Sequence, residues 1–266
     1  MTSTVRPSVL AALFVSCVLV SALAIAAQRP SGPQGESYAS MATLPDWSGV
    51  WVRPFAEFAA ENASERDPAS GVGPRLTPAV AAQRAASRER VSARADTAAD
   101  PAIRGTSCSV PGGMPHIMRF PFGIEFLFTP GRVTMLLETG PMVRRIYTDG
   151  RPHRVDPDAT YAGESIGHWE GDTLVVDTVA ITPLAAVTNG VTGSGKTRIT
   201  ERIRRVDPTH IRIDTVVQDP EVLQTPWRYS RMYERSDAGH FERYCDNNRD
   251  GNDTEPDLTP PPAGVR

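Results

Sequence analysis

The second half of the chain is organised as short runs in which apolar and polar side chains alternate, with turn-forming residues between them. The turn signals include Pro130-Gly131, Asp149-Gly150 and Asp207-Pro208. The runs with the β-branched and aromatic content of strands are 124–129, 132–138, 143–148, 173–179, 198–206, 210–218, 227–235 and 240–245. Strands at intervals of about 8–12 residues predict an antiparallel barrel or sandwich rather than a βαβ fold.

A different pattern precedes this series and predicts a surface helix. Thr77 is suited to cap a helix and Pro78 to occupy its first position, and an Ala- and Arg-rich stretch then continues without a breaker to about Thr97. Few large apolar residues occur in it, so we expect it to lie on the surface. The polar stretch from Glu57 to Gly73 is typical of a loop.

The first 26 residues have the organisation of a cleavable secretory signal. Arg6 precedes an apolar run from Val9 to Ala24, and Ala24-Ile25-Ala26 fits the small-residue cleavage pattern. A retained transmembrane anchor is the alternative, since the run approaches the length that spans a bilayer. We predict a periplasmic or secreted bacterial protein with a linker at 27–45, one β-rich domain at 46–250 and a disordered tail at 251–266.

Charge and cysteine content limit the classes of partner that we expect and predict how the cysteines are used. Without Arg6 the chain carries 27 basic and 31 acidic residues, a net charge of −4, which argues against nucleic acid or an anionic membrane as the main partner. Signal removal leaves Cys108 and Cys245, an even pair that predicts a disulfide in an oxidising compartment. Neither has the neighbouring Cys or His that a zinc site needs.

The segment Gly190-Val-Thr-Gly-Ser-Gly-Lys-Thr197 matches the phosphate-binding pattern G-x-x-x-x-G-K-[ST]. That chemistry requires a strand before the loop and a helix after it. Residues 183–189 make a poor strand, and the run from Arg198 to Val206 alternates as a strand does. We therefore expect a glycine-rich connection here and no nucleotide.

A second motif match lies near the end of the chain. Asp246-Asn-Asn-Arg-Asp250-Gly251 resembles the opening of a calcium loop, and Asp257 occupies the twelfth position. Pro256 and the Pro-rich end disfavour the helix that should follow. A solvated acidic tail is the preferred interpretation, and calcium binding stays open.

The densest group of chemically active side chains lies between Arg144 and Asp177. Alternation places Glu164, Ile166 and His168 on one strand face and Ser165, Gly167 and Trp169 on the other. A Glu and a His on one face could act as acid and base, or form an ordinary hydrogen-bonded pair. Residues 163–167 also satisfy G-x-S-x-G, but a strand and hairpin follow instead of the helix that a nucleophile elbow needs.

These stretches are similar to those of a large family of exported bacterial proteins. The shared motifs, as this sequence carries them, are D-x-S-G-V-W, L-T-P, C-x-x-P-x-G-x-P, I-Y-T-D-G-R-x-H, G-x-S-x-G-x-W-E-G-D-T-L-V-V-D-T and C-x-x-N. They stand here at 46–51, 76–78, 108–115, 146–153, 163–178 and 245–248. The resemblance covers nearly the whole mature chain and implies export, and it assigns no catalytic residues. Glu164 stands where many relatives have His, and His116 where they have Arg.

The sequence thus predicts a mainly β protein, an antiparallel lipocalin-like β-barrel with an N-terminal helical appendage. Gly49-Val50-Trp51 also resembles the G-x-W start of lipocalins, whose barrels hold a small apolar ligand. The expected function is binding of a small, partly apolar molecule inside the barrel, without metal or cofactor. The predicted ligand-binding residues are Arg144, Tyr147, Trp169 and Asp177.

The alternative is a cofactor-independent lyase, isomerase or hydrolase. Its acid–base groups would be His168, Glu164, His153 and His116, with Arg144 steadying an anion. Convergence of these four side chains in one cavity would favour the enzyme, and their dispersal over outer turns would favour a binding or structural role.

Overall fold

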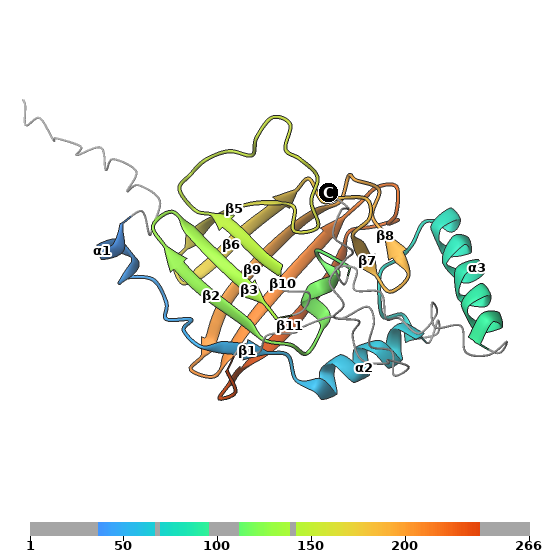
Figure 1. The fold of residues 1–266 in the computed structure, drawn as a ribbon, viewed down its shortest axis with the longest axis horizontal. Helices are drawn as coiled ribbons and strands as arrows, with labels where there is room; N and C mark the ends of the chain where they lie inside the picture. Colours follow the sequence, from blue (N-terminus) through green and yellow to red (C-terminus); the bar gives the residue numbers. More distant parts are fainter. Residues whose placement is uncertain (1–36, 67–69, 96–111, 139–141, 240–266) are drawn as a thin grey trace, which may run out of the picture. The chain divides into compact units, whose positions relative to one another are not determined.

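The alternating runs form a closed barrel in the computed structural model, which describes residues 37–66, 70–95, 112–138 and 142–239 (Figure 1). The strand order around the barrel is β1-β11-β10-β9-β6-β5-β4-β3-β2. Its strands are β1 (Val50–Val52), β2 (Ile124–Thr129), β3 (Arg132–Leu137), β4 (Met142–Tyr147), β5 (Glu164–Glu170), β6 (Thr173–Val179), β9 (Arg198–Asp207), β10 (His210–Gln218) and β11 (Trp227–Ser236). The prediction of a mainly β, lipocalin-like barrel is confirmed.

Two junctions in the barrel wall are short. β1 and β2 pair at two positions, and so do β4 and β5, whereas β9 and β10 stay paired from His210 to Gln218. The β4–β5 junction is also parallel, where the sequence predicted antiparallel strands throughout. The long connection between β4 and β5 allows this, because a parallel pair cannot be joined by a tight turn. It arches away from the strands at the top of Figure 1.

The barrel interior is filled by side chains. Its buried core runs from Trp47 and Trp51 through Phe126 and Met135 to Ile203 and Tyr233. The short 3₁₀ helix η3 (His116–Arg119) adds Ile117 and Met118, together with Met114 just before it. At one end Trp47 packs on Phe126, Phe128 and Trp169, with ring centroids 5.1–5.5 Å apart. The sequence did not predict η3.

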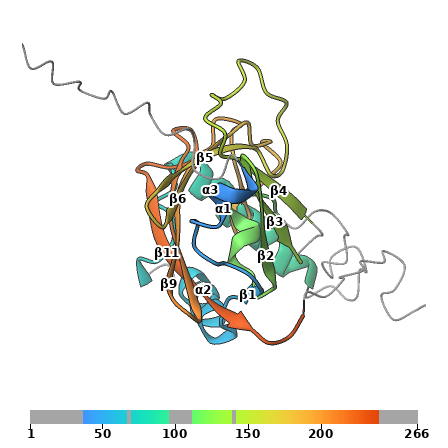
Figure 2. The same cartoon turned by 90° about the vertical axis from the view of Figure 1, so that its left-hand side faces the viewer.

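Three α-helices accompany the barrel in the described part of the chain. α3 (Pro78–Ala95) agrees with the predicted surface helix. α2 (Phe55–Arg66) corrects the loop expected from Glu57 to Gly73, and α1 (Tyr38–Met41), capped by Ser37, lies within the expected linker. Figure 2 shows the blue segment that joins α1 to β1 in front of the barrel strands. Within the described residues, no helix has both the length and the apolar character that crossing a bilayer requires.

The reason that α2 was missed is tertiary. Its Glu61 pairs with Arg231 of β11, at 2.8 Å between Oε1 and Nη2, and with the buried Arg53. Its Glu65 pairs with the buried Arg119, at 3.1 Å between Oε2 and Nη1. Arg231 and Arg119 lie far from α2 in sequence, so composition alone gives no sign of these contacts.

The hairpin of β7 (Ala186–Thr188) and β8 (Val191–Thr192) lies outside the barrel order. Val187 and Val191 join Val217, Val222 and Leu223 in a second apolar cluster, on which Leu76 and Val80 pack. This cluster anchors the beginning of α3.

One polar network crosses the interior of the barrel. Arg144 of β4 and Glu201 of β9 form an ion pair with both side chains 1% exposed. Arg144 also donates from Nε to Ser165 Oγ of β5, at 3.2 Å, and from Nη2 to Thr178 Oγ1 of β6, at 2.9 Å. The network therefore joins strands on both sides of the short β4–β5 junction.

Arg144→Met should destabilise the fold by about 3–5 kcal/mol, because it leaves the Glu201 carboxylate buried without its cation. The double variant Arg144→Met/Glu201→Met should recover most of that loss, since no charge then stays buried. Urea unfolding of the wild type, the two single variants and the double variant measures the coupling. A double variant that loses at least the sum of the two single losses would show that the pair is not coupled.

Candidate functional site

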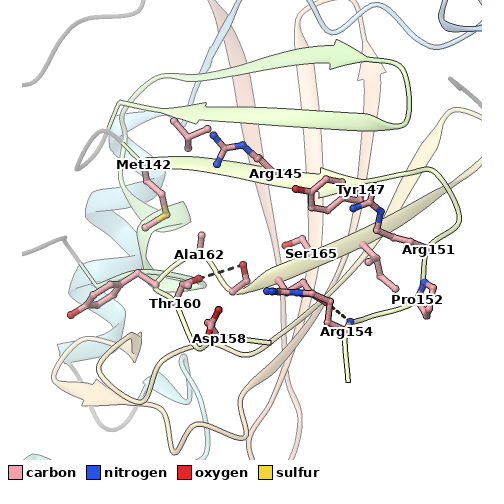
Figure 3. A pocket seen from close by; sticks show the side chains of 15 residues that line it. Met142, Arg145, Tyr147, Arg151, Pro152, Arg154, Asp158, Thr160, Ala162 and Ser165 are labelled. Atoms are coloured by element: carbon pink, nitrogen blue, oxygen red, sulfur yellow. Dashed lines mark hydrogen bonds and ion pairs between the residues drawn. The ribbon is translucent and has the colours of Figure 1, made fainter. Parts of the chain in front are cut away.

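The β4–β5 junction opens into a cleft on the outside of the barrel. The two strands pair only at Ile146 with Ser165 and at Tyr147 with Ile166. β4 therefore has no β5 partner from Met142 to Arg145, and a cavity of about 690 Å³ occupies this place. We call it the β4–β5 cleft. Figure 3 shows the β4 side chains along one side and residues of the 148–163 connection with Ser165 along the other.

The walls of the cleft combine apolar surface with charge. Its apolar and aromatic lining consists of Met142, Val143, Tyr147, Pro152, Tyr161 and Ile166. Its charged lining consists of Arg145, Arg151, Arg154, Asp158 and Glu164. A concave surface with apolar walls and a few placed polar groups is the usual form of a small-molecule site.

Two of the three arginines are already paired. Arg151 donates from Nε to both Asp149 oxygens, at 2.8 and 2.9 Å, and its guanidinium lies 4.0 Å from the centroid of the Tyr147 ring. Arg154 pairs with Glu164. Arg145 makes no ion pair or hydrogen bond through its side chain to any described residue, so it is the unpaired cation of the cleft.

His153 lies at the edge of the cleft between two carboxylates. Its Nδ1 is 3.2 Å from Glu164 Oε1, and its Nε2 is 3.2 Å from Asp177 Oδ2. When the imidazole is protonated, both ring N–H groups can donate to these oxygens. These two contacts hold the 148–163 connection against β5 and β6.

Both carboxylates are held in their ionised form. Burial acts to raise the pKa of Glu164, but hydrogen bonds from Arg154 and His153 outweigh it and lower that pKa. Burial also acts to raise the pKa of Asp177, and Arg198 outweighs it with bonds of 2.8 and 2.6 Å to the two oxygens. The contacts of His153 are thus part of a network of ion pairs, in which neither Glu164 nor Asp177 is a neutral acid placed to donate a proton.

The other two predicted acid–base residues lie elsewhere. His168 is on the outer face of β5, 65% exposed, with Nε2 at 3.2 Å from Glu170 Oε1. His116 lies in η3 and is partly buried, with its ring edge-on to that of Phe120 at 5.3 Å between centroids. Burial, aided by Arg119 and Arg231, lowers the pKa of His116 to about 3, so its imidazole is neutral. The four residues expected to converge therefore occupy three places, and only Glu164 and His153 meet.

The predicted ligand-binding residues are also separated. Tyr147 lines the β4–β5 cleft, and Asp177 belongs to the His153 network. Trp169 packs in the aromatic cluster at one end of the interior. The Arg144 guanidinium is paired with Glu201. Ser165 of the G-x-S-x-G match is buried and hydrogen-bonded to Arg144 and Thr178. Both side chains are 1% exposed and bonded within the protein.

The sequence reasoning missed Arg145 and Tyr161. The signal for Arg145 was present, because Arg144 and Arg145 are adjacent on a strand and alternation turns one inward and the other outward. The sequence does not indicate whether Arg144 or Arg145 is the one that points into the interior. Tyr161 reaches the cleft through the 148–163 connection, whose path depends on the His153 contacts.

The glycine-rich segment 190–197 binds a carboxylate of the protein itself, that of Asp219. The buried Asp219 carboxylate accepts from Ser194 N at 2.9 Å, from Ser194 Oγ at 2.7 Å and from Thr197 Oγ1 at 2.7 Å. Lys196 pairs with Glu221. The strand β9 follows the loop, as expected, instead of a helix.

Several predictions fall outside the described residues. These are the signal peptide at 1–26, the Cys108–Cys245 disulfide and the calcium-loop match from Asp246 to Asp257, and they stay predictions. Among the described residues, no group of three or more His, Cys, Asp or Glu side chains is placed to hold a metal ion.

Comparison with protein-family profiles, curated proteins and solved structures finds no match to this chain. The resemblance to exported bacterial proteins therefore stays an expectation from the motifs.

Asp219→Asn should lower the free energy of unfolding by about 1.5–3 kcal/mol at neutral pH, because it weakens hydrogen bonds to a charged acceptor. Burial acts to raise the pKa of Asp219, but the bonds from Ser194 and Thr197 lower it below the unfolded value. Its contribution is therefore present above about pH 4 and is lost as the pH falls through the folded pKa. Chemical unfolding between pH 3 and 7 measures this, with exposed Asp237→Asn as control. Equal stability losses in the two variants would contradict the assignment.

Proposed function

We propose that this chain is an exported, lipocalin-like binding protein that holds a small, partly apolar anion in the β4–β5 cleft. The observation that carries the proposal is the unpaired guanidinium of Arg145 on the wall of an amphipathic cleft of about 690 Å³. The segment containing Arg6, the apolar run to Ala24 and the following small residues supports export.

The packing of the barrel favours the cleft over the interior expected from the sequence. Large side chains and η3 fill the inside, and its charges at Arg144 and Glu201 neutralise each other. A ligand there would have to displace well-packed apolar groups and disturb a buried ion pair, both of which cost free energy. A ligand in the β4–β5 cleft displaces only solvent.

The polarity of the cleft favours an anion with an apolar body. Arg151 and Arg154 pair with Asp149 and Glu164, and the remaining lining carboxylate, Asp158, interacts with Arg154, so Arg145 supplies the available positive charge. A guanidinium binds carboxylate or phosphate oxygens through paired N–H groups. The Tyr147 and Tyr161 rings and Ile166 offer apolar contact to the rest of the molecule.

The enzyme alternative has less support in this cleft. Glu164 lines it, but its Oε1 accepts from Arg154 N at 2.8 Å and lies near His153, and its Oε2 pairs with the Arg154 guanidinium. Both His153 nitrogens face carboxylates as well. Proton transfer to a bound molecule would first require one of these contacts to break.

Arg145→Gln should weaken binding of 3-phenylpropanoate at least tenfold, because it removes the unpaired cation of the β4–β5 cleft and preserves most of the side chain's bulk. The neutral 3-phenylpropanamide should bind the wild type weakly and be insensitive to the substitution. NMR titration of the folded protein gives the dissociation constants. Arg228→Gln is the matched control, since Arg228 is an exposed arginine on β11, outside the β4–β5 cleft.

Equal affinity of wild type and Arg145→Gln for the carboxylate would refute the role of Arg145. Loss of affinity in Arg228→Gln as well would indicate a general effect of net charge instead of a site.

A further inference from the structure

The 148–163 connection forms one wall of the β4–β5 cleft, and backbone hydrogen bonds anchor both of its ends. At its beginning, Thr148 N donates to Gly131 O at 2.8 Å. Near its end, Thr160 N donates to Ala180 O at 3.0 Å. These bonds fix where the wall leaves the barrel and where it returns.

The middle of this wall is held by two side chains. Within the described part of the chain, the hydrogen bonds that tie the stretch 152–159 to other elements come from His153 and Arg154. Arg154 reaches Glu164 of β5, through its backbone N at 2.8 Å and through its guanidinium. His153 reaches both Glu164 and Asp177, so it ties this stretch to β6 as well as to β5.

The geometry of the two His153 contacts requires a protonated imidazole. Nδ1 lies 3.2 Å from Glu164 Oε1 and Nε2 lies 3.2 Å from Asp177 Oδ2. An ionised carboxylate can only accept, and a neutral imidazole has one N–H to donate. Its second nitrogen would therefore turn a lone pair toward a carboxylate oxygen. Loss of the proton from His153 thus removes one contact and replaces it with repulsion.

The charged groups around His153 come from several elements of the described structure. They are Glu164 of β5, Asp177 of β6, Arg198 of β9, which pairs with Asp177, and Arg154 and Arg151 of the connection, which act on Glu164. Burial acts to raise the pKa of both carboxyls, but the hydrogen bonds outweigh it and lower the pKa of each. Between about pH 4 and about pH 6 both carboxylates are therefore ionised while an imidazole in water carries its proton.

We propose that protonation of His153 fastens this wall, so that the β4–β5 cleft is ordered and holds its anion best at mildly acidic pH. As the pH rises through the range in which imidazoles titrate, one His153 contact is lost and the stretch 152–159 loosens. The protonated ring also adds positive charge beside the cleft, which favours an anion in the same pH range. This regulation rests on the function proposed above, because it acts on the affinity of the same cleft.

The order of the wall is measured first, without ligand, by ¹³Cα relaxation of Val155 and Ala159 at about pH 5.5 and about pH 8.5, on either side of the ordinary imidazole titration. Both residues should be more mobile at the higher pH in the wild type. In His153→Gln they should be mobile at both pH values, because glutamine does not titrate. His168→Gln is the matched control and should behave as the wild type does, since His168 also lies 3.2 Å from a carboxylate, that of Glu170, but outside the cleft.

The affinity for 3-phenylpropanoate is then measured at the same two pH values. The wild type should bind about threefold more weakly, or worse, at the higher pH, because a hydrogen bond between two charged groups is lost from the wall. His153→Gln should bind equally at the two pH values, close to the wild type at the higher one. His168→Gln should keep the wild-type difference.

Equal wild-type affinity at the two pH values would overturn the regulation and leave the proposed binding site standing. A difference that persists in His153→Gln, or that disappears in His168→Gln, would also overturn it. If His153→Gln does not fold, wild-type order that is the same at both pH values is enough to refute the role of His153. Absence of binding at both pH values would instead refute the proposed function, and the regulation of affinity with it.

Discussion

The ion pair between Arg144 and Glu201 is the contact on which the rest of this barrel depends. It joins β4 to β9 through the interior, and the Arg144 guanidinium also reaches Ser165 of β5 and Thr178 of β6. β4 and β5 share only two paired positions, so few backbone hydrogen bonds close the wall at this place. Side chains inside the barrel therefore provide the closure that the backbone ladder lacks.

The short junction has opposite consequences on the two faces of the wall. Inside, the Arg144 network and the apolar core seal it, and Arg144, Ser165 and Thr178 find hydrogen-bond partners in one another there. Outside, the unpaired part of β4 leaves a cleft beneath the 148–163 connection. His153 holds that connection in place through Glu164 and Asp177. The same feature that weakens the wall thus creates the surface on which we expect a ligand to bind.

Local sequence signals predicted much of this fold. Alternation and the turns at Pro130-Gly131 and Asp207-Pro208 located β2, β3, β9 and β10 to within a residue of their observed ends. Alternation also placed Glu164 and His168 on one face of β5, and that is what the structure shows. It could not tell which face is inside, because Ser165 and Gly167 are no more apolar than Ile166. The expected acid–base face is therefore the outer one, and the interior position belongs to Ser165.

What the sequence did not predict depends on contacts between distant residues. The sequence of α2 has the composition of a polar loop. The ion pairs of Glu61 with Arg231 and of Glu65 with Arg119 form only in the folded protein. The glycine-rich loop matches a phosphate-binding motif because it does stabilise an anion, but the anion is Asp219, more than twenty residues further along the chain. A loop with the same local pattern can thus bind a ligand in one fold and a side chain of the protein in another.

We propose that the ligand of this protein binds outside a filled barrel. The most direct measurement is an amide and indole NMR titration of the wild-type protein with 3-phenylpropanoate. We predict shifts for the backbone amides of Val143, Arg145 and Gly163, which border the β4–β5 cleft, and unchanged indole N–H signals for Trp47, Trp51 and Trp169. Shifts of those interior indoles with the Arg145 amide unmoved would contradict it and would place the ligand inside the barrel.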